Sequence, residues 1–346
     1  MGAPVNSVTS RRATNPESII YVVARMDIAG DIGGTHTRLA LFDPGAAGPA
    51  ALEVYSSRDH DGLEAMIGAF LKTHPAHVER ACFGVAGPVQ NGHVKTTNLA
   101  WPVDARHVAQ MLGIERVGLV NDLYANAYGI ADLGPDDIAT LREGDPSMGG
   151  NAAVISAGTG LGEAGLFWDR RRYHVFATEG GHTDFAPRDE QETALRAYLA
   201  RRHPHVSYER VCSGMGLVAI HDFLSDREGV DARDHANAAA ITNAALDGGD
   251  PVSARALDMM VSIYGAEAGN LALKLLATGG IYVGGGIAPR ILDKLEAGPF
   301  LEALDAKGRF AELISRIPVH VILNDRTALL GAARLARGEE PGLHHG

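Results

Sequence analysis

Five polar residues from separate parts of the sequence could together bind a ligand rich in hydroxyl groups. They comprise three carboxylates, an amide and an imidazole: Asn121, Asp122, Glu179, His182 and Glu209. A ring of sugar hydroxyls needs both hydrogen-bond acceptors and donors, and one carboxylate can accept from two neighbouring hydroxyls. A metal site is the alternative interpretation, since histidine and carboxylates are also metal ligands. No pair among the five has a firm helical ligand spacing, which favours the sugar.

Two of these residues, Asn121 and Asp122, directly follow the short apolar run Val117–Val120. Polar groups just past the carboxyl end of a buried strand are a common place for chemistry in open α/β sheets. The alternative is a helix cap for residues 123–130, a role that needs only one of the two side chains.

The stretch Gly30-Asp-Ile-Gly-Gly-Thr35 lies between two apolar runs and predicts a strand, a tight turn and a second strand. Gly33 and Gly34 permit positive φ, and they leave the N–H groups of the turn open to phosphate oxygens. Asp31 adds a carboxylate that a hydrated Mg²⁺ could bridge to those phosphates. An ordinary hairpin with an acidic turn is the alternative.

A second stretch, Ala157-Gly-Thr-Gly-Leu-Gly162, repeats this pattern. The interval from Gly34 to Asp43 equals that from Gly160 to Asp169, and the copies are offset by 126 residues. This offset indicates a duplicated domain rather than a repeat array. Two such hairpins, one from each lobe, could hold a single polyphosphate from both sides.

A third glycine turn, Gly284–Gly286, is predicted between a strand and the start of a helix. A flat ring or a phosphate could lie against the backbone there. The sequence lacks a P-loop signature, so the phosphates would be held by hairpin backbone and metal rather than by a P-loop lysine.

Length and composition limit the possible classes of protein. A chain of 346 residues is longer than one core usually supports and predicts two lobes. Its net charge of −11 argues against binding to nucleic acid or to an anionic membrane surface. No run of eighteen apolar residues is present, so we expect no membrane span. The only cysteines, Cys82 and Cys212, lie too far apart for a zinc site and fit a reducing compartment.

The first 25 residues carry serine, threonine and Arg11-Arg12 and precede an apolar run too short for a secretory signal. We expect a disordered tail, or a start upstream of the true one at Met26, in preference to an organelle transit peptide.

Hydrophobic periodicity, together with the glycine and proline residues that interrupt it, indicates the helices and strands that must position the polar residues. The predicted helices, strands and linker are a helix over 63–74, a strand over 80–88, a linker over 132–151, helices over 234–246 and 252–277, a strand over 319–323 and a helix from about 328.

Six motifs in order resemble those of bacterial ATP-dependent glucokinases. They are Gly30–Thr35, Leu119–Asp122, Ala157–Gly162, Glu179–Phe185, Ser207–Arg210 and Gly284–Ile287. The resemblance extends from about residue 26 to residue 338.

This resemblance implies an α/β, two-lobed, duplicated ribonuclease H-like fold, that of the actin-like ATPases, with a mixed five-stranded sheet in each lobe. Residues 1–25 would be the disordered leader and 26–132 the small lobe, completed by the C-terminal helix at about 324–340. Residues 133–323 would form the large lobe.

The resemblance also assigns roles to residues. Asp122 would be the general base. The sugar would be held by Asn121, Asp122, Glu179, His182, Glu209 and Asn98. The nucleotide phosphates would lie against Gly30, Asp31, Ile32, Gly33, Gly34 and Thr35 of one hairpin and Gly158, Thr159 and Gly160 of the other. The adenosine would lie near Gly284, Gly285 and Gly286, and Asp31 would reach Mg²⁺ through water.

The implied activity is transfer of the γ-phosphate of ATP to the 6-hydroxyl of glucose, which yields glucose 6-phosphate and ADP in the first step of glycolysis. ATP with Mg²⁺ and glucose are the implied partners, without nucleic acid or membrane, and we expect a cytoplasmic homodimer. The alternatives are a broader hexose kinase of the repressor/open-reading-frame/kinase (ROK) group and a non-catalytic sugar or nucleotide sensor. A chaperone-like or actin-like ATPase is a further rival. The zinc motif of the ROK group needs closely spaced cysteines, which this sequence lacks.

Overall fold

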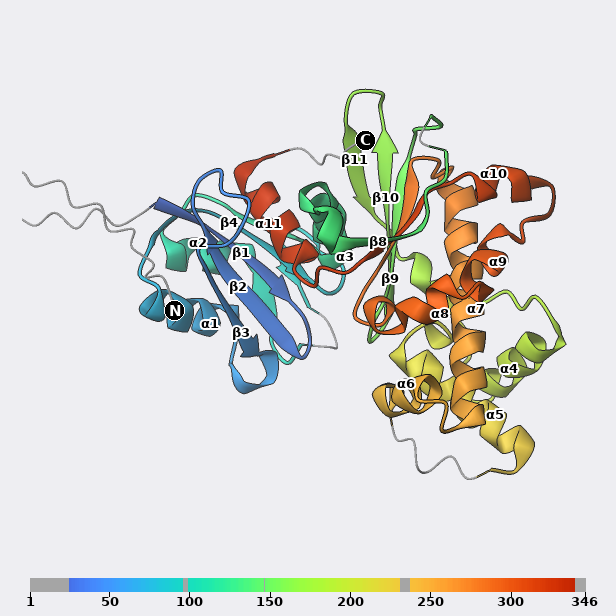
Figure 1. The fold of residues 1–346 in the computed structure, drawn as a ribbon. Coiled ribbons are helices and arrows are strands. Elements are labelled where there is room, and N and C mark those ends of the chain that lie inside the picture. The colour runs from blue at the N-terminus through green and yellow to red at the C-terminus, as the bar shows by residue number, and fades with distance from the viewer. Residues whose placement is uncertain (1–24, 96–98, 146, 231–236, 340–346) are drawn as a thin grey trace, which may run out of the picture.

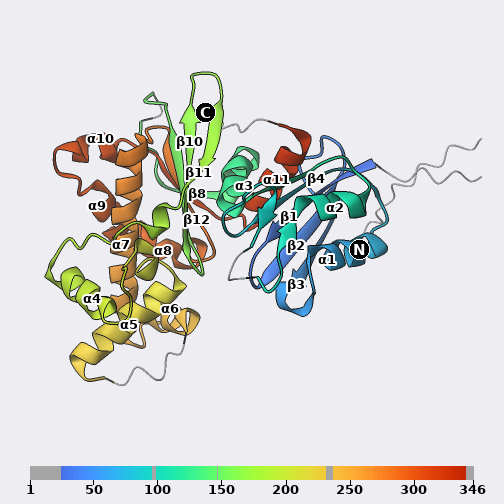
Figure 2. The same ribbon diagram turned by 180° about the vertical axis from the view of Figure 1, so that it is seen from behind.

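The computed structural model describes residues 25–95, 99–145, 147–230 and 237–339. Two β-sheets lie in separate parts of the molecule, each with its own helices, and α3 and α11 lie between them (Figures 1 and 2). The predicted α/β class is therefore confirmed.

The first sheet contains five strands in the order β3-β2-β1-β4-β7. Strands β1, β2 and β3 are antiparallel neighbours, whereas β4 and β7 continue the sheet in parallel with β1. Their bounds are β1 Arg25–Ile32, β2 His36–Phe42, β3 Ala51–Ser56, β4 His77–Val85 and β7 Val117–Asn121. A separate small pair is formed by β5 His93–Val94 and β6 Val103–Asp104.

The second sheet repeats this arrangement in the order β11-β10-β9-β12-β13, with the same pairing directions. The strands are β8 Ile138–Arg142, β9 Ala152–Ala157, β10 Leu161–Trp168, β11 Tyr173–Ala177, β12 Gly280–Gly284 and β13 Val319–Ile322. The two predicted glycine hairpins are thus β1–β2 and β9–β10, at equivalent places in the two sheets.

The second sheet differs from our expectation in having six strands rather than five. The additional strand, β8, pairs antiparallel with β13 at the sheet edge. It lies within residues 132–151, which the sequence predicts as a linker because glycine, aspartate and proline surround the short β-forming run Ile138–Leu141.

Where the range of a helix is predicted from the sequence, the structure has a helix at nearly the same residues. The helices are α1 Leu63–Thr73, α2 Ala105–Leu112, α3 Asp122–Gly129, α4 Glu190–Ala200, α5 Gly214–Glu228, α6 Ala238–Leu246, α7 Pro251–Leu275, α8 Leu292–Glu296, α9 Pro299–Asp305, α10 Ala311–Ser315 and α11 Thr327–Arg337. Short 3₁₀ turns near the site are η1 Ser57–Asp59, η4 Gly180–His182, η5 Tyr208–Arg210 and η7 Ala288–Ile291.

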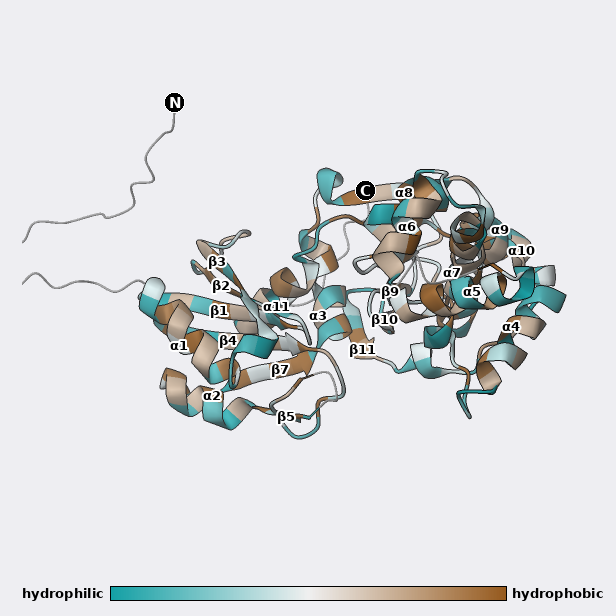
Figure 3. Cartoon of the chain, turned by 90° about the horizontal axis from the view of Figure 1, so that it is seen from below, coloured by the Kyte–Doolittle hydropathy of each residue, from teal (hydrophilic) through white to brown (hydrophobic). Residues whose placement is uncertain are grey.

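Each sheet is covered on both faces, because successive strand residues point to opposite sides. In the first sheet, Ile28 packs with α1 and α2, whereas its neighbour Ala29 packs with α11. In the second sheet, Ala153 belongs to the core beneath α5–α7, and Val154 packs toward α3. Hydropathy colouring shows apolar residues along the strands of the first sheet beside α1 and α2 (Figure 3).

The C-terminal helix therefore completes the core of the N-terminal sheet. Leu329, Leu330, Ala332 and Ala333 pack against Ala29, Ala40 and Phe42 of β1 and β2. In the part of the chain that the structure describes, no helix is long and apolar enough to cross a membrane.

Replacement of Leu329 by alanine tests this packing. Leu329 is fully buried, so Leu329→Ala should lower the free energy of unfolding by about 2–5 kcal/mol through lost burial and the cavity left behind. Denaturant unfolding measures this loss. The matched control is Leu246→Ala at an exposed position, which should change stability by about 0.5 kcal/mol or less. Equal effects of the two substitutions would contradict the proposed contribution of α11.

Candidate active site

A cavity of about 770 Å³ lies between the two sheets and is lined from both. Residues that line it from the side of the first sheet include Gly33, Gly34, Thr35, Arg58, Gly87, Lys95, Asn121 and Asp122. Residues from the side of the second sheet include Ser156, Gly158, Thr159, Gly160, Glu163, Thr178, Glu179, His182 and Glu209. All five polar residues singled out in the sequence therefore meet here.

Asn121 and Asp122 have separate tasks at the junction of β7 and α3. The Asn121 side chain caps the helix: its Oδ1 accepts from the backbone N–H groups of Leu123, at 2.9 Å, and Tyr124, at 3.2 Å. Its Nδ2 donates to the Gly87 carbonyl at 3.3 Å. The cap needs only Asn121, so the Asp122 carboxylate faces the cavity from the first helical turn. Asn121 is therefore a helix cap, as the alternative interpretation predicted, while Asp122 lines the cavity at the carboxyl end of β7.

The Asp122 carboxyl is a weaker acid than an ordinary aspartate. Burial is the main cause and the negative charge of Asp31 adds to it, so the pKa of Asp122 is raised to about 6. Hydrogen bonds from backbone N–H groups, including Leu123 N at 2.9 Å, oppose this rise. A carboxylate that is ionised at neutral pH, with a pKa this close to it, suits proton acceptance.

The other three polar residues come from two short turns beside the second sheet. Glu179 follows β11 and begins η4, which also contains His182. Glu209 lies in η5; its Oε2 accepts from Leu161 N at 3.0 Å, and its Oε1 is 3.9 Å from His182 Nδ1. The wall from the second sheet thus holds two carboxylates and an imidazole opposite Asp122.

The two glycine turns line the same cavity, but not all of their predicted residues do. Gly33, Gly34 and Thr35 line it, as do Gly158, Thr159 and Gly160. Gly30 and Ile32 do not: a Cβ atom at Gly30 would overlap the Phe83 ring, and the Ile32 side chain is fully buried. Neither Gly33 nor Gly34 has positive φ, contrary to our expectation. These two glycines therefore leave the backbone uncovered without providing an unusual conformation.

Asp31 lies just behind the first turn rather than among the residues that line the cavity. Its Oδ2 accepts from Arg38 Nη1 at 3.3 Å, and Arg38 also donates to Asp325 at 2.9 Å. Burial raises the pKa of Asp31, and Arg38 opposes the rise. No group of three or more His, Cys, Asp or Glu side chains that could hold a metal ion occurs in the described ranges.

The third glycine turn lies directly beside the second. Gly285 has φ +86°, and a Cβ atom there would overlap the Ala157 carbonyl, so both its conformation and its contacts require glycine. The Ile287 N–H donates to the same carbonyl at 3.3 Å. Gly284–Gly286 do not line the cavity, and the predicted helix start is a 3₁₀ turn, η7. A helix N-terminus therefore provides no phosphate site here.

Several residues that line the cavity were not predicted from the sequence, including Arg58, Lys95, Ser156, Glu163 and Thr178. Arg58 follows Ser57, whose Oγ donates to the Gly33 carbonyl at 2.7 Å and whose N–H donates to Thr35 O at 3.0 Å. Neither Arg58 nor Lys95 lies in a recognisable motif, so no sequence signal indicated them. Asn98, predicted beside the sugar, lies outside the described residues.

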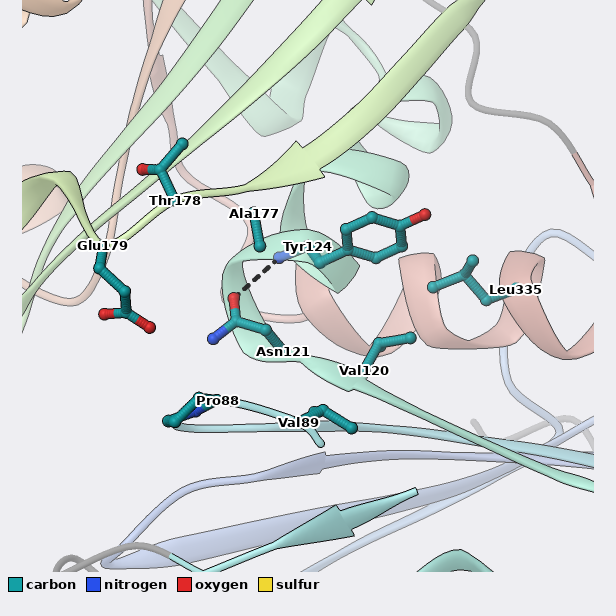
Figure 4. A pocket seen from close by; sticks show the side chains of 9 residues that line it. All are labelled: Pro88, Val89, Val120, Asn121, Tyr124, Ala177, Thr178, Glu179 and Leu335. Atoms are coloured by element: carbon teal, nitrogen blue, oxygen red, sulfur yellow. Dashed lines mark hydrogen bonds between the residues drawn. The ribbon is translucent and has the colours of Figure 1, made fainter. Parts of the chain in front are cut away.

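A second, more apolar cavity of about 450 Å³ adjoins the first (Figure 4). Pro88, Asn121, Thr178 and Glu179 line both cavities, whereas Val89, Val120, Tyr124, Ala177 and Leu335 line only this one. Asn121 and Glu179 thus lie at the boundary between a polar and an apolar space.

Solved structures share this fold over nearly the whole chain and belong to sugar kinases. A glucokinase from an Antarctic psychrotroph aligns with a TM-score of 0.79 and 32% identity, over 91% of this chain and 99% of that one. A glucokinase from Balamuthia mandrillaris, determined with glucose, aligns with a TM-score of 0.76 over 92% of this chain and 96% of that one, at 22% identity.

Sequence comparison defines the family. The glucokinase family model matches residues 28–339. A glucokinase of Nostoc sp. is 44% identical over 335 residues, which cover 89% of this chain and 98% of that protein. A glucokinase of Caulobacter vibrioides is 38% identical over 315 residues, covering 89% and 94%. The chain belongs to the glucokinase family, as its motifs predicted.

The raised pKa of Asp122 predicts a pH-dependent cost in stability. Folding raises this pKa from 3.8 to about 6, so the wild-type protein loses stability as the pH rises through that window. Asp122→Asn lacks the buried charge and should be more stable above pH 6, by on the order of 1–3 kcal/mol. The advantage should shrink as the pH falls toward 4.

Chemical denaturation across this pH range measures the effect, and Asp136→Asn at an exposed position is the control. A stability difference between Asp122→Asn and the wild-type protein that does not change with pH would show that Asp122 is not a buried, weak acid.

Proposed function

We propose that this chain transfers the γ-phosphoryl group of ATP to the 6-hydroxyl of glucose, forming glucose 6-phosphate and ADP. The observation that carries the proposal is the position of Asp122, a carboxylate with a pKa of about 6, in one cavity with both glycine turns. The family relationship supports it. A ROK-family glucokinase from Streptomyces griseus, solved with glucose and AMPPNP, shares the fold with a TM-score of 0.62 at 22% identity.

In this proposal the sugar occupies the part of the cavity between Asp122 and the second sheet. Glu179 and Glu209 accept hydrogen bonds from sugar hydroxyls. The Asn121 Nδ2 donates, because Asn121 Oδ1 is already engaged by the helix cap. His182 can donate or accept, depending on its tautomer. We also propose Asn98 as a sugar contact, solely because of the resemblance to glucokinases.

The nucleotide phosphates would lie against the two glycine turns. The uncovered backbone of Gly33–Thr35 and Gly158–Gly160 offers N–H donors from opposite walls of one cavity. Gly30 and Ile32 support the first turn through packing rather than by touching phosphate. Gly284–Gly286 lie behind the second turn, and we assign the adenosine to that side.

The cavity must also offset the charge of the transferred group. ATP would enter with Mg²⁺ as part of the substrate, and Asp31 is the carboxylate placed behind the first turn to reach that ion through water. Arg58 and Lys95 are cations that line the cavity. The hydrogen bonds of Ser57 to Gly33 and Thr35 fix the backbone beside Arg58, close to the proposed phosphates.

Asp122 would accept the proton of the 6-hydroxyl as that oxygen attacks the γ-phosphorus in line. A carboxylate is far too weak a base to form a free alkoxide, so proton transfer accompanies bond formation. Base catalysis contributes roughly 10²–10⁴-fold, and positioning and charge stabilisation provide the rest.

The proposal also includes the fold type and the division into two lobes. We infer an actin-like ATPase fold whose small lobe, residues 26–132 with the helix at about 324–340, closes on a large lobe, residues 133–323. Closure would exclude water and limit ATP hydrolysis. Cytoplasmic location and a homodimeric state are proposed from the family resemblance, and light scattering of the purified protein would test the dimer.

A panel of hexoses assayed with ATP and Mg²⁺ tests the proposed reaction. Glucose should be phosphorylated, with kcat/KM falling below about pH 6 as Asp122 becomes protonated. Asp122→Asn should lower kcat by at least about 10²-fold and still bind glucose. Comparable turnover of several hexoses would favour the broader ROK-type kinase, and glucose binding without turnover in the wild-type protein would favour a sensor. Near-normal turnover in Asp122→Asn would remove Asp122 from the mechanism.

Glu179→Ala should raise the KM for glucose more than the KM for ATP, because Glu179 lies on the proposed sugar side of the cavity. Steady-state kinetics with each substrate varied in turn measures both constants. Glu296→Ala, at an exposed position in α8, is the matched control and should change neither constant. A larger effect on the KM for ATP would place the sugar elsewhere.

A further inference from the structure

A buried acidic side chain beneath the site is not used by the proposed mechanism. Glu163 lies on β10 with 1% of its surface exposed, and it lines the larger cavity. Its Oε1 has no hydrogen-bond partner among the described residues. Leaving a buried carboxyl oxygen without a partner is costly. A buried, unsatisfied group of this kind points to a functional constraint at this position.

Glu163 contacts the segment that carries Glu179. Its carboxyl lies against Gly180 so closely that a Cβ atom there would overlap it. Its backbone carbonyl accepts from Thr178 Oγ1 at 3.0 Å, and that hydroxyl accepts from Gly180 N at 3.2 Å. Both the main chain and the side chain of Glu163 thus hold the residues on either side of Glu179.

On its other side Glu163 meets a second buried acid. The carboxyl of Glu267, on α7, is fully buried, and its charge helps to raise the pKa of Glu163. Glu267 also accepts from Lys274 Nζ at 2.9 Å and from Asn270 Nδ2 at 2.8 Å. Two carboxyl groups close together in a buried site cannot both ionise readily. Burial and the Glu267 charge therefore favour the protonated, neutral form of Glu163.

The same network reaches the segment that carries Glu209. Asn270 Nδ2 also donates to the hydroxyl of Tyr208, at 3.0 Å, and Tyr208 immediately precedes Glu209. Lys307 Nζ donates to Asn270 Oδ1 at 2.8 Å. Asn270 thus joins Glu267 to the turn that carries Glu209.

We propose that Glu163 is a positioning residue which, together with Glu267, holds the Thr178–Gly181 segment so that Glu179 can bind the sugar. This inference rests on the proposed function, because it concerns the sugar side of that site. Glu163 does so as a neutral carboxyl, which packs against Gly180 without adding a charge.

The pH dependence follows from the groups that face Glu163. They are Glu267, Lys274 and Tyr264 from α7, and Cys212, which follows η5. Burial and the Glu267 charge raise the pKa of Glu163 to about 8, with Lys274 opposing the rise. Above that pH two buried carboxylates would repel each other, and the segment that carries Glu179 would lose its position.

Two substitutions separate this role from a merely structural one. Glu163→Gln keeps the size and shape of the side chain and stays neutral, so its glucose KM at pH 7 should remain within about threefold of the wild-type value. Glu163→Ala removes the support and should raise the glucose KM about tenfold or more, with a smaller effect on the ATP KM. The wild-type glucose KM should rise above about pH 8, and Glu163→Gln should lack this rise.

Calorimetric titration of each variant with glucose provides a readout that does not depend on turnover. Glu192→Gln is the control, since Glu192 is equally buried but pairs with Arg188 away from the cavity; it should leave the glucose KM unchanged. If Glu163→Ala does not fold, the pH dependence of the glucose KM in Glu163→Gln still tests the inference. An unchanged glucose affinity in folded Glu163→Ala, or the same alkaline rise in Glu163→Gln, would overturn the inference. Failure of the wild-type protein to phosphorylate any hexose would instead overturn the proposed function.

Discussion

The hydrogen bonds between the Asn121 side chain and the start of α3 are the interaction on which the site depends. They end β7 of the first sheet at a fixed residue and begin a helix that packs on the second sheet. Such a cap stabilises a protein by about 0.5–2 kcal/mol, and here it also fixes the position of the residue that follows it. The residue after the cap, Asp122, is carried into the space between the sheets, where burial and the charges of other acids act on it.

Opposing effects determine the pKa values of the acids in the cavity. Burial and neighbouring negative charges raise the pKa of Asp122, whereas backbone N–H groups at the helix start favour its ionised form. Glu163 lacks such donors and faces another acid, and its pKa is higher. The two acids in this cavity thus differ in their pKa values: Asp122 can lose its proton near neutral pH, whereas Glu163 keeps its proton. Their surroundings, not their residue type, make this difference.

Much of this arrangement could be predicted from the sequence because it rests on local patterns. The glycine hairpins, the strand that ends at Asn121 and the long helix α7 all have clear periodicity and breakers. The strand β8 was missed because its short run of β-forming residues is surrounded by turn residues. Arg58 and Glu163 were missed for another reason. Arg58 lines the cavity because its neighbour Ser57 is bonded to Gly33 and Thr35, and Glu163 lies beside Glu267 of α7; only the tertiary fold brings these residues together.

The position of α11 has a consequence for the order in which the chain acquires its structure during synthesis. One face of the first sheet, at Ala29, Ala40 and Phe42, is covered by residues 329–333. Those strands leave the ribosome early, but the helix that covers them leaves only after the strands of both sheets. The second sheet has all its strands by Ile322. The half of the protein that is translated first is therefore the half that finishes packing last, and until then it presents an apolar face that needs protection from aggregation.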